Sequence, residues 1–383
     1  MITLRIDRRA LVTLGALAVL AGCKVIPKGV EQAPPPPTGP TEALPSDQNR
    51  QRIALLVPLS GPEAALGQSI ANATTMALLD TGAKTIRVTT YDTGPGAAAA
   101  ANKALMDGNR LILGPLLADD VPTVAAIARP ARVPLIAYTG DTALAARDVF
   151  VLGTSSDNSI ERVVEYAHAH GVNRFALLAP KGTFGTRATA TYAAAVQAAG
   201  GTLVNTQTYD RGNKSIVSAA TRLKARGGYD AVLIADSGKY AALAAPQLKS
   251  AGATSPRILG TDLWSGELAI SKTPALRGAW FAALSDQRFA RFAESYKARF
   301  GEQPYRMATF GYDSVLLAVR ISRDWRLNTP FPVARLTDRD GFLGLDGPFR
   351  FSPSGTSERA LEVRETRAGG FTVVSPAPER FGA

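Results

Sequence analysis

The chain has 383 residues, of which 46% are hydrophobic and 20% charged, so it can bury a large core and fold into more than one lobe. Its formal net charge at pH 7 is +11, yet no run of five or more basic residues occurs, which argues against a nucleic-acid-binding protein. A single cysteine excludes a disulfide bond within the chain.

The first residues have the pattern of an export signal. Arg5, Arg8 and Arg9 form a basic start, and residues 10–21 form an apolar run that ends in small residues. A membrane-spanning helix needs about 20 apolar residues, so this run is too short to span. We therefore predict a signal peptide over residues 1–22, which is removed on export.

Cys23 follows this run at the position where the bacterial lipobox, which the segment resembles, places its lipid-modified cysteine. The resemblance implies that acylated Cys23 anchors the mature chain to a membrane without spanning it. Lys24 follows, rather than an aspartate, and in similar Gram-negative lipoproteins this implies the periplasmic face of the outer membrane. The alternative is an ordinary secretory signal followed by a chance cysteine.

Residues 23–50 are rich in proline and include four consecutive prolines at 34–37. Polyproline is stiff and extended, at about 3.1 Å per residue. We interpret this segment as a tether between the lipid and the folded part. A proline-rich ligand for a partner protein is the alternative.

From residue 52 onward, short apolar runs alternate with segments of helical periodicity. The first series predicts strands at 53–57, 86–91, 111–113 and 134–137, with helices at 67–79, 96–106 and 121–128, and the pattern restarts after the run 150–153. The second predicts strands at 174–178, 203–208, 231–235 and 257–259, with helices at 160–170, 186–199, 214–225 and 239–250. Such alternation is typical of parallel sheets covered by helices on both faces.

The last third of the chain fits neither series alone. It predicts helices at 289–300 and 308–325, then antiparallel strands at 349–351 and 361–366. We therefore expect an α/β fold with two Rossmann-like lobes, between which the chain crosses more than once.

Several segments together resemble a known family. They are RIALLVPLSGP (52–62), LGPL (113–116), VPLIA (133–137), FGEQP (300–304), GYDS (311–314) and GLDGPFRF (344–351). In this order they resemble type I periplasmic binding proteins of the leucine/isoleucine/valine-binding kind, over about residues 50–374. The resemblance implies lobe I at 51–154 plus about 283–345, lobe II at 155–282 plus about 346–375, and a tail at 376–383.

Three further segments, APQL (245–248), GTDLWSG (260–266) and GAWF (278–281), are similar to one branch of that superfamily. This branch consists of outer-membrane lipoproteins that bind and activate penicillin-binding proteins, the enzymes that synthesise peptidoglycan. Its best-known members carry a helical repeat domain before the binding-protein fold, whereas here only the proline-rich segment precedes residue 50. The alternative function is a substrate-binding lipoprotein of a transporter for branched-chain amino acids or a related small molecule.

The resemblance also places candidate ligand contacts in the cleft between the lobes. They are Ser60, Gly61, Gly114, Leu116, Tyr138, Thr139, Thr183, Phe184, Ser237, Asp262 and Trp264. Leu116 and Leu117, after the third strand, have no hydrogen-bonding side chain, whereas residues 138–141 have several. The amino-acid site of the family is thus only half present. Turn formation and helix capping are the alternative roles of each residue.

The sequence contains few residues or motifs that would support catalysis or metal binding. The only two histidines, His168 and His170, are two positions apart on a predicted helix and face different directions. No H-E-x-x-H, G-x-S-x-G or P-loop motif occurs. The loop 182–185 lacks the lysine and serine of a phosphate-binding loop. We therefore expect a binding protein without cofactor or metal rather than an enzyme.

Overall fold

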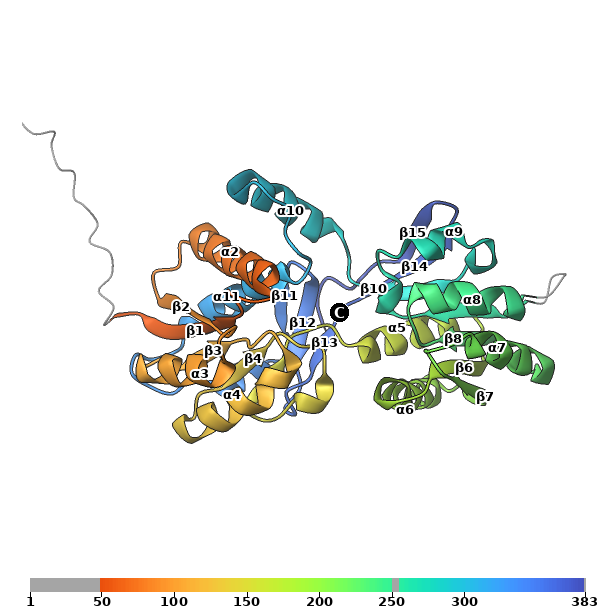
Figure 1. Cartoon of the computed structure of the whole chain (residues 1–383), viewed down its shortest axis with the longest axis horizontal. Helices are drawn as coiled ribbons and strands as arrows, with labels where there is room; N and C mark the ends of the chain where they lie inside the picture. The colour runs from red at the N-terminus through yellow and green to blue at the C-terminus, as the bar shows by residue number, and fades with distance from the viewer. Residues whose placement is uncertain (1–48, 250–254, 382–383) are drawn as a thin grey trace, which may run out of the picture. The chain divides into compact units, whose positions relative to one another are not determined.

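The computed structural model describes residues 49–249 and 255–381 (Figure 1). The predicted signal peptide, Cys23 and the proline-rich segment up to residue 48 lie outside the described residues, as does the end of the helix predicted at 239–250. Of the helices within the described part, none has the length and apolar composition needed to cross a membrane.

Lobe I contains a five-stranded parallel sheet with the strand order β2-β1-β3-β4-β5. Its strands are β1 (Gln51–Val57), β2 (Ile86–Asp92), β3 (Leu111–Leu113), β4 (Leu135–Ala137) and β5 (Val149–Val151). The helices between them are α2 (Ala64–Thr81), α3 (Ala97–Met106) and α4 (Val121–Ala128). The predicted alternation of apolar strands and helices in this half is confirmed.

Both faces of this sheet are covered, which explains why β1 is apolar at successive positions. Ile53 and Leu55 pack with α2 and with α11 (Ala308–Ser322), whereas Ala54 and Leu56 pack with α3 and α4. Figure 1 shows α11 beside α2, although the two helices are far apart in the sequence. The late part of the chain therefore completes the core of lobe I.

Helix α10 (Gln287–Phe300) also belongs to lobe I. Its Phe292 and Tyr296 pack against Ala73 and Met76 of α2. The helix ends at Gly301, whose φ of 80° lies in the left-handed region that favours glycine.

Lobe II contains a seven-stranded sheet with the order β15-β14-β10-β9-β8-β6-β7. Its strands are β6 (Arg174–Pro180), β7 (Thr202–Tyr209), β8 (Ala231–Ile234), β9 (Arg257–Gly260), β10 (Trp280–Ala283), β14 (Glu362–Arg367) and β15 (Gly370–Ser375). Strands β6 to β10 pair in parallel, and β14 and β15 add antiparallel pairs at one edge. The helices are α5 (Ser156–Ala169), α6 (Thr183–Ala198), α7 (Ser215–Arg226), α8 (Gly238–Leu248) and α9 (Leu268–Lys272).

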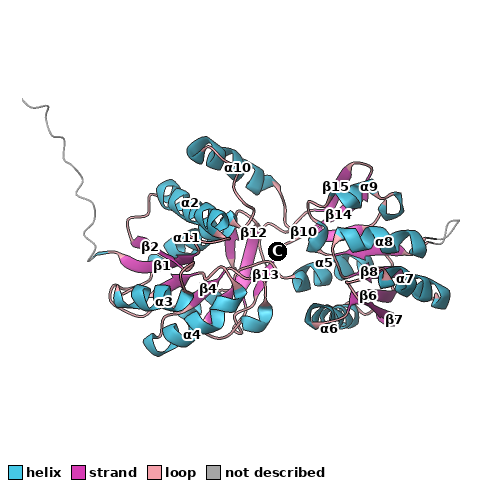
Figure 2. Cartoon of the chain, viewed as in Figure 1, coloured by secondary structure: helices cyan, strands magenta, loops and turns pink. Residues whose placement is uncertain are grey.

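The helices of lobe II again cover both faces of the sheet (Figure 2). Phe175 and Leu177 of β6 pack with α5 and α6, while Ala176 and Leu178 pack with α7 and α8. Helix α5 starts where Ser155 caps it, since the Ser155 side chain accepts a hydrogen bond from the Asp157 amide.

A small antiparallel sheet packs in lobe I, so the last boundary between lobe I and lobe II differs from the predicted one. It consists of β11 (Phe342–Gly344), β12 (Gly347–Phe351) and β13 (Ser357–Arg359). We expected residues from 346 onward in lobe II, but Phe349 and Phe351 are buried in the lobe I core, where Phe351 contacts Phe150 at 5.4 Å between ring centroids. The apolar face of the hairpin is covered there, so the chain enters the lobe II sheet only at β14.

The chain passes between the lobes three times. It leaves lobe I after β5, returns after β10, and enters lobe II again between β13 and β14. The expectation of multiple crossings is therefore confirmed.

The placement of β12 can be tested by unfolding. Phe349 is fully buried, so Phe349→Ala is expected to lower the free energy of unfolding by about 3–5 kcal/mol, measured by urea denaturation. Leu343, in the same small sheet, is 48% exposed, and Leu343→Ala is the control, with an expected loss below about 1 kcal/mol. Equal losses in the two variants would contradict this packing.

Candidate functional site

The carboxyl ends of the parallel strands carry most of the predicted site residues, as expected for ligand sites in open α/β sheets. In lobe I, the Ser60 hydroxyl donates a hydrogen bond to the Asp92 carboxylate at 2.7 Å. The Leu59 and Gly94 amides also donate to Asp92, at 2.7 and 2.8 Å. These hydrogen bonds, that from Leu59 foremost, lower the pKa of Asp92. Ser60 therefore lies in an exposed turn around a carboxylate that is already satisfied.

The turn after β3 needs glycine at position 114. Gly114 has a φ of 97°, and a Cβ atom there would lie 2.3 Å from the carbonyl oxygen of Leu56. Gly61, in the turn after β1, also has a positive φ, 81°. Leu116 is only 4% exposed and packs in the lobe I core, whereas Leu117 is 40% exposed. The apolar group that this turn presents is thus Leu117.

Tyr138 lies in the lobe I core rather than at the exposed edge of the sheet. It is fully buried, and its hydroxyl lies 2.8 Å from the Ser314 hydroxyl on α11. Burial raises the pKa of Tyr138. The next residue, Thr139, is 8% exposed, and its hydroxyl accepts a hydrogen bond from the Asp141 amide at 3.0 Å. Both side chains therefore have partners within lobe I.

At the corresponding edge of lobe II, a buried carboxylate organises the strand ends. Asp236, after β8, accepts two hydrogen bonds from the Arg211 guanidinium, at 2.9 and 3.1 Å, and one from the Tyr209 hydroxyl at 2.6 Å. The Ser237 amide donates to the same carboxylate at 2.8 Å. Burial and the Asp236 carboxylate together raise the pKa of Tyr209. Asp236 is thus fully engaged within lobe II.

The other predicted residues of lobe II surround this group. Thr183 and Phe184 begin α6, and the Arg211 guanidinium lies 5.0 Å from the centroid of the Phe184 ring. Trp264 is 1% exposed, and its indole nitrogen donates to the Asp236 carbonyl at 2.9 Å. The indole is therefore a core group that supports the Asp236 turn.

Asp262 lies beside the start of α5. Its carboxylate accepts a hydrogen bond from the Ser159 hydroxyl at 3.1 Å, and its amide donates to the same hydroxyl at 3.1 Å. Burial raises the pKa of Asp262, while hydrogen bonds from Ser156 and Ser159 act in the opposite direction. Leu263, the next residue, is 36% exposed.

One contact between the lobes was not predicted. Arg187 on α6 of lobe II lies 2.9 Å from the carboxylate of Asp141, in the loop after β4 of lobe I, and 3.9 Å from that of Asp157. The Thr142 hydroxyl also donates to Asp157, at 3.3 Å. The ion pair between Arg187 and Asp141 thus links the two lobes.

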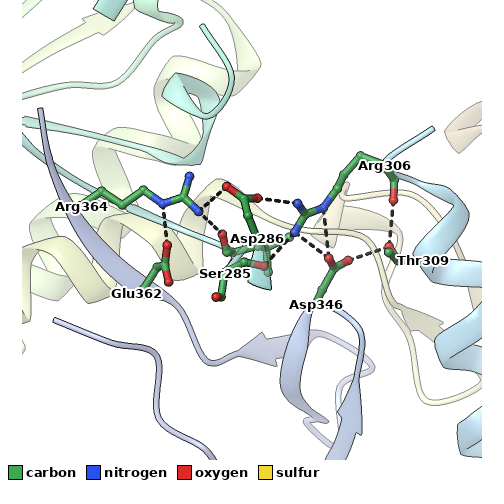
Figure 3. Close-up of polar contacts among 8 residues, drawn as sticks. Ser285, Asp286, Arg306, Thr309, Asp346, Glu362 and Arg364 are labelled. Carbon is green, nitrogen blue, oxygen red and sulfur yellow. Dashed lines mark hydrogen bonds and ion pairs between the residues drawn. The ribbon is translucent and has the colours of Figure 1, made fainter. Parts of the chain in front are cut away.

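A second charged network lies where the chain crosses between the lobes (Figure 3). Asp286, just after β10, lies 2.7 Å from the Arg306 guanidinium and 2.8 Å from that of Arg364 on β14. Arg306 also contacts Asp346 at 2.8 Å, and Arg364 contacts Glu362 at 2.6 Å. Arg364 and Asp346 are almost fully buried, so each needs these partners.

The missed groups had one signal in the sequence. Asp92 and Asp236 directly follow predicted strands, and Arg211 comes soon after one, so the rule that sites lie at strand ends would have selected them. Their pairing had no such signal, because it depends on which strand ends are neighbours in the sheet. Within the described residues, no group of three or more His, Cys, Asp or Glu side chains is placed to hold a metal ion.

The model of the family described as "Periplasmic binding protein" matches residues 50–370, and the chain therefore belongs to this family. Uncharacterized protein RP748 of Rickettsia prowazekii (strain Madrid E) is 29% identical over 140 residues, which cover 36% of this chain. The match spans only 38% of the length of that relative.

Two solved structures share the fold. A putative branched-chain amino acid ABC transporter protein from Rhodospirillum rubrum has a TM-score of 0.74 and 19% identity, covering 85% of this chain and 100% of the other. Full-length LpoA from Haemophilus influenzae has a TM-score of 0.67 and 19% identity, covering 86% of this chain and 59% of the other. At these identities the similarity concerns the fold.

A buried carboxyl group close to the charged network of Figure 3 should make the stability of the fold depend on pH. Asp313 on α11 is 1% exposed, and its Oδ2 has no hydrogen-bond partner. Burial, and then the nearby Asp346 carboxylate, raise the pKa of Asp313 to about 7. The folded state therefore binds this proton more tightly than the unfolded state, where an aspartate has a pKa of about 3.9. Its stabilising contribution is complete below pH 4 and is lost as the pH rises to about 7.

We expect Asp313→Asn to remove this loss, so the variant should gain stability relative to the wild type between pH 5 and pH 8 in urea denaturation. Ser314→Ala, at the neighbouring buried position, removes no titratable group and should change stability equally at both pH values. A constant difference between Asp313→Asn and the wild type across this range would contradict the assignment.

Proposed function

We propose that this chain is a lipid-anchored protein of the Gram-negative outer membrane, facing the periplasm, that regulates peptidoglycan synthesis by binding and activating a penicillin-binding protein. The proposal rests on the hydrogen bonding of the carboxylates at the carboxyl edges of the two sheets. The carboxylates of Asp92, Asp236 and Asp262 are each hydrogen-bonded by groups of their own lobe.

A site for a free amino acid must hold an ammonium and a carboxylate, because an unpaired buried charge costs several kcal/mol. At the edges described here, the carboxylates are already paired, and the turn after β3 presents a leucine instead of a hydroxyl. Leu117 and Leu263 are 40% and 36% exposed at the ends of β3 and β9. Exposed apolar side chains at a polar rim suit a protein surface better than a zwitterion.

The sequence resemblance and the comparisons support the same proposal. Full-length LpoA from Haemophilus influenzae shares the fold at a TM-score of 0.67, and the match covers 59% of its length. The segments at 245–248, 260–266 and 278–281 resemble lipoproteins that activate penicillin-binding proteins. The predicted acylation of Cys23 fits an envelope protein of that kind. These similarities support the proposal through the fold, and the partner is inferred from them.

The leucines allow a direct test. Purified synthase of the bifunctional penicillin-binding class, immobilised for biolayer interferometry, is expected to bind the wild-type chain. The double variant Leu117→Asp, Leu263→Asp should bind at least about tenfold more weakly, since it places charge in an apolar contact. Leu79→Asp, on α2, where Leu79 is 62% exposed, is the matched control and should bind as the wild type does. Unchanged binding of the double variant, or no binding by the wild type, would reject this mode of contact.

A second function has its own supporting observation. The Rhodospirillum rubrum protein, described as a putative branched-chain amino acid ABC transporter, matches over its whole length at a TM-score of 0.74. The alternative is therefore a substrate-binding lipoprotein that delivers a small molecule to a transporter.

The two functions differ in what leucine, isoleucine or valine does to stability. A selective ligand at about 100 times its Kd stabilises a folded protein by about 2.7 kcal/mol. We expect no rise in the midpoint of thermal unfolding of the full chain when saturating leucine, isoleucine or valine is added. A rise that disappears with the D-amino acid as control would favour the transport function.

A further inference from the structure

The segment that follows β15 reaches from lobe II back to lobe I. Strand β15 lies at one edge of the lobe II sheet, and the chain leaves it at Ser375. Further along, the centroid of the Phe381 ring lies 4.6 Å from the guanidinium carbon of Arg350. Arg350 belongs to β12, and Figure 1 shows β12 and β15 in different lobes. We call residues 376–381 the strap.

The surface on which Phe381 packs is held in place by lobe I itself. The Arg350 side chain forms an ion pair with Glu358 of the neighbouring strand β13, at 2.7 Å. Gly341, just before β11, is the second neighbour, because a Cβ atom there would lie 3.1 Å from Cδ2 of Phe381. The Gly341 carbonyl accepts a hydrogen bond from Arg320 of α11 at 2.6 Å. The ring therefore docks on a fixed part of lobe I.

The strap also borders the junction between the lobes. Residues 376–379 line a cavity of about 470 Å³, and Asp286 and Arg364 of the charged network in Figure 3 line the same cavity. Its remaining walls include residues of β12 in lobe I and of β15 in lobe II. The strap thus adds a link between the lobes at the junction that the Asp286 ion pairs hold.

Few contacts hold the strap. In the part of the chain that the structure describes, residues 376–381 form no helix or strand and make no hydrogen bond or ion pair. An exposed contact between a guanidinium group and an aromatic ring changes an equilibrium constant by about two- to fivefold. Pro376 and Pro378 fix two φ angles, so the segment loses less conformational entropy when it docks. Docking and release are therefore close in free energy.

The other contact between the lobes described above is also weak. The Arg187 and Asp141 side chains are 32% and 44% exposed, and exposed ion pairs contribute little to stability. Segments where a chain crosses between two lobes commonly act as hinges. The angle between the lobes therefore depends on links such as the strap.

We propose that the strap is a releasable link that fixes the angle between the lobes and thereby regulates the partner surface around Leu117 and Leu263. Leu117 follows β3 of lobe I, and Leu263 follows β9 of lobe II, so a partner that contacts both needs them at one separation. Release of the strap lowers the fraction of molecules with that separation, and the apparent affinity falls in proportion. The regulation rests on the proposed function, whereas the effect on the lobes does not.

The angle between the lobes can be measured by double electron–electron resonance on the full chain with Cys23→Ser. Spin labels are attached at Leu79→Cys on α2 and Ala225→Cys on α7, which are exposed positions in lobe I and lobe II. Phe381→Ala should raise the population of a second interlobe distance by about two- to fivefold relative to the parent chain. Phe381→Tyr keeps an aromatic ring beside Arg350 and should give the parent distribution.

Arg380→Ala is the matched control, because Arg380 lies exposed in the same segment. It should leave the distance distribution unchanged. Arg350→Gln removes the other half of the contact and should change the distribution as Phe381→Ala does. The two substitutions together should have no larger effect than either alone, since each removes the same contact.

An unchanged distribution in Phe381→Ala, or the same change in Arg380→Ala, would overturn the strap. Its effect on the partner is measured separately by biolayer interferometry on an immobilised bifunctional penicillin-binding protein. Phe381→Ala should bind about two- to fivefold more weakly than the parent chain, and Arg380→Ala should bind equally. Unchanged binding by Phe381→Ala would overturn the regulation. Failure of the parent chain to bind would overturn the regulation together with the proposed function, while the distance measurement would still decide whether the strap holds the lobes.

Discussion

The Asp286 carboxylate lies between two guanidinium groups, and this interaction holds the crossing segments together. Arg306 precedes α11 of lobe I, and Arg364 lies on β14 of lobe II, so one carboxylate is shared by both lobes. Arg364 is 2% exposed and would be a costly buried charge without Asp286 and Glu362. Segments of both lobes meet at these ion pairs. The relative placement of the strand ends of the two sheets therefore depends on the Asp286 interactions.

Arg359 connects the first interlobe crossing, after β5, with the third, between β13 and β14. It is 4% exposed, its guanidinium donates to the Leu152 carbonyl at 2.6 Å, and it lies 5.2 Å from the Phe349 ring centroid. Leu152 directly follows β5, and Arg359 ends β13. The three crossings are thus joined by buried arginines whose partners are carboxylates, a backbone carbonyl and aromatic rings. Such contacts are specific in geometry, because a misplaced guanidinium would leave a buried charge unpaired.

Much of the fold could be predicted because it depends on local patterns. Apolar runs such as 53–57 and 175–178 have no polar face, as a strand covered on both sides requires, and helical periodicity between such runs predicts the parallel topology. The position of β12 could not be predicted in this way. Phe349 and Phe351 are equally apolar in either lobe, and only the aromatic cluster around Phe150 decides that they belong to lobe I.

In the candidate site, too, features with a local sequence pattern could be predicted, and contacts between distant residues could not. The strand-end positions of Ser60, Gly114 and Asp262 could be predicted because turn residues there have a local signature. Arg364 and Asp286 are 78 positions apart, and Arg306 and Asp346 are 40 apart, so no local pattern marks these pairs. Tyr138 and Trp264 follow predicted strands too, but their large apolar rings turn into the cores, where Ser314 and the Asp236 carbonyl satisfy their polar atoms. Strand-end position therefore selects candidates, and packing within each lobe decides which of them reach the surface.

We propose above that the strand ends of this periplasmic binding protein fold contact a protein and not a free amino acid. The most direct measurement is photocrosslinking in intact cells, with a benzophenone amino acid in place of Leu117 and, as control, of Leu79. We expect a covalent adduct with a bifunctional penicillin-binding protein from position 117 that is absent from position 79. An adduct with a transporter subunit from position 117, or none with any protein, would contradict it.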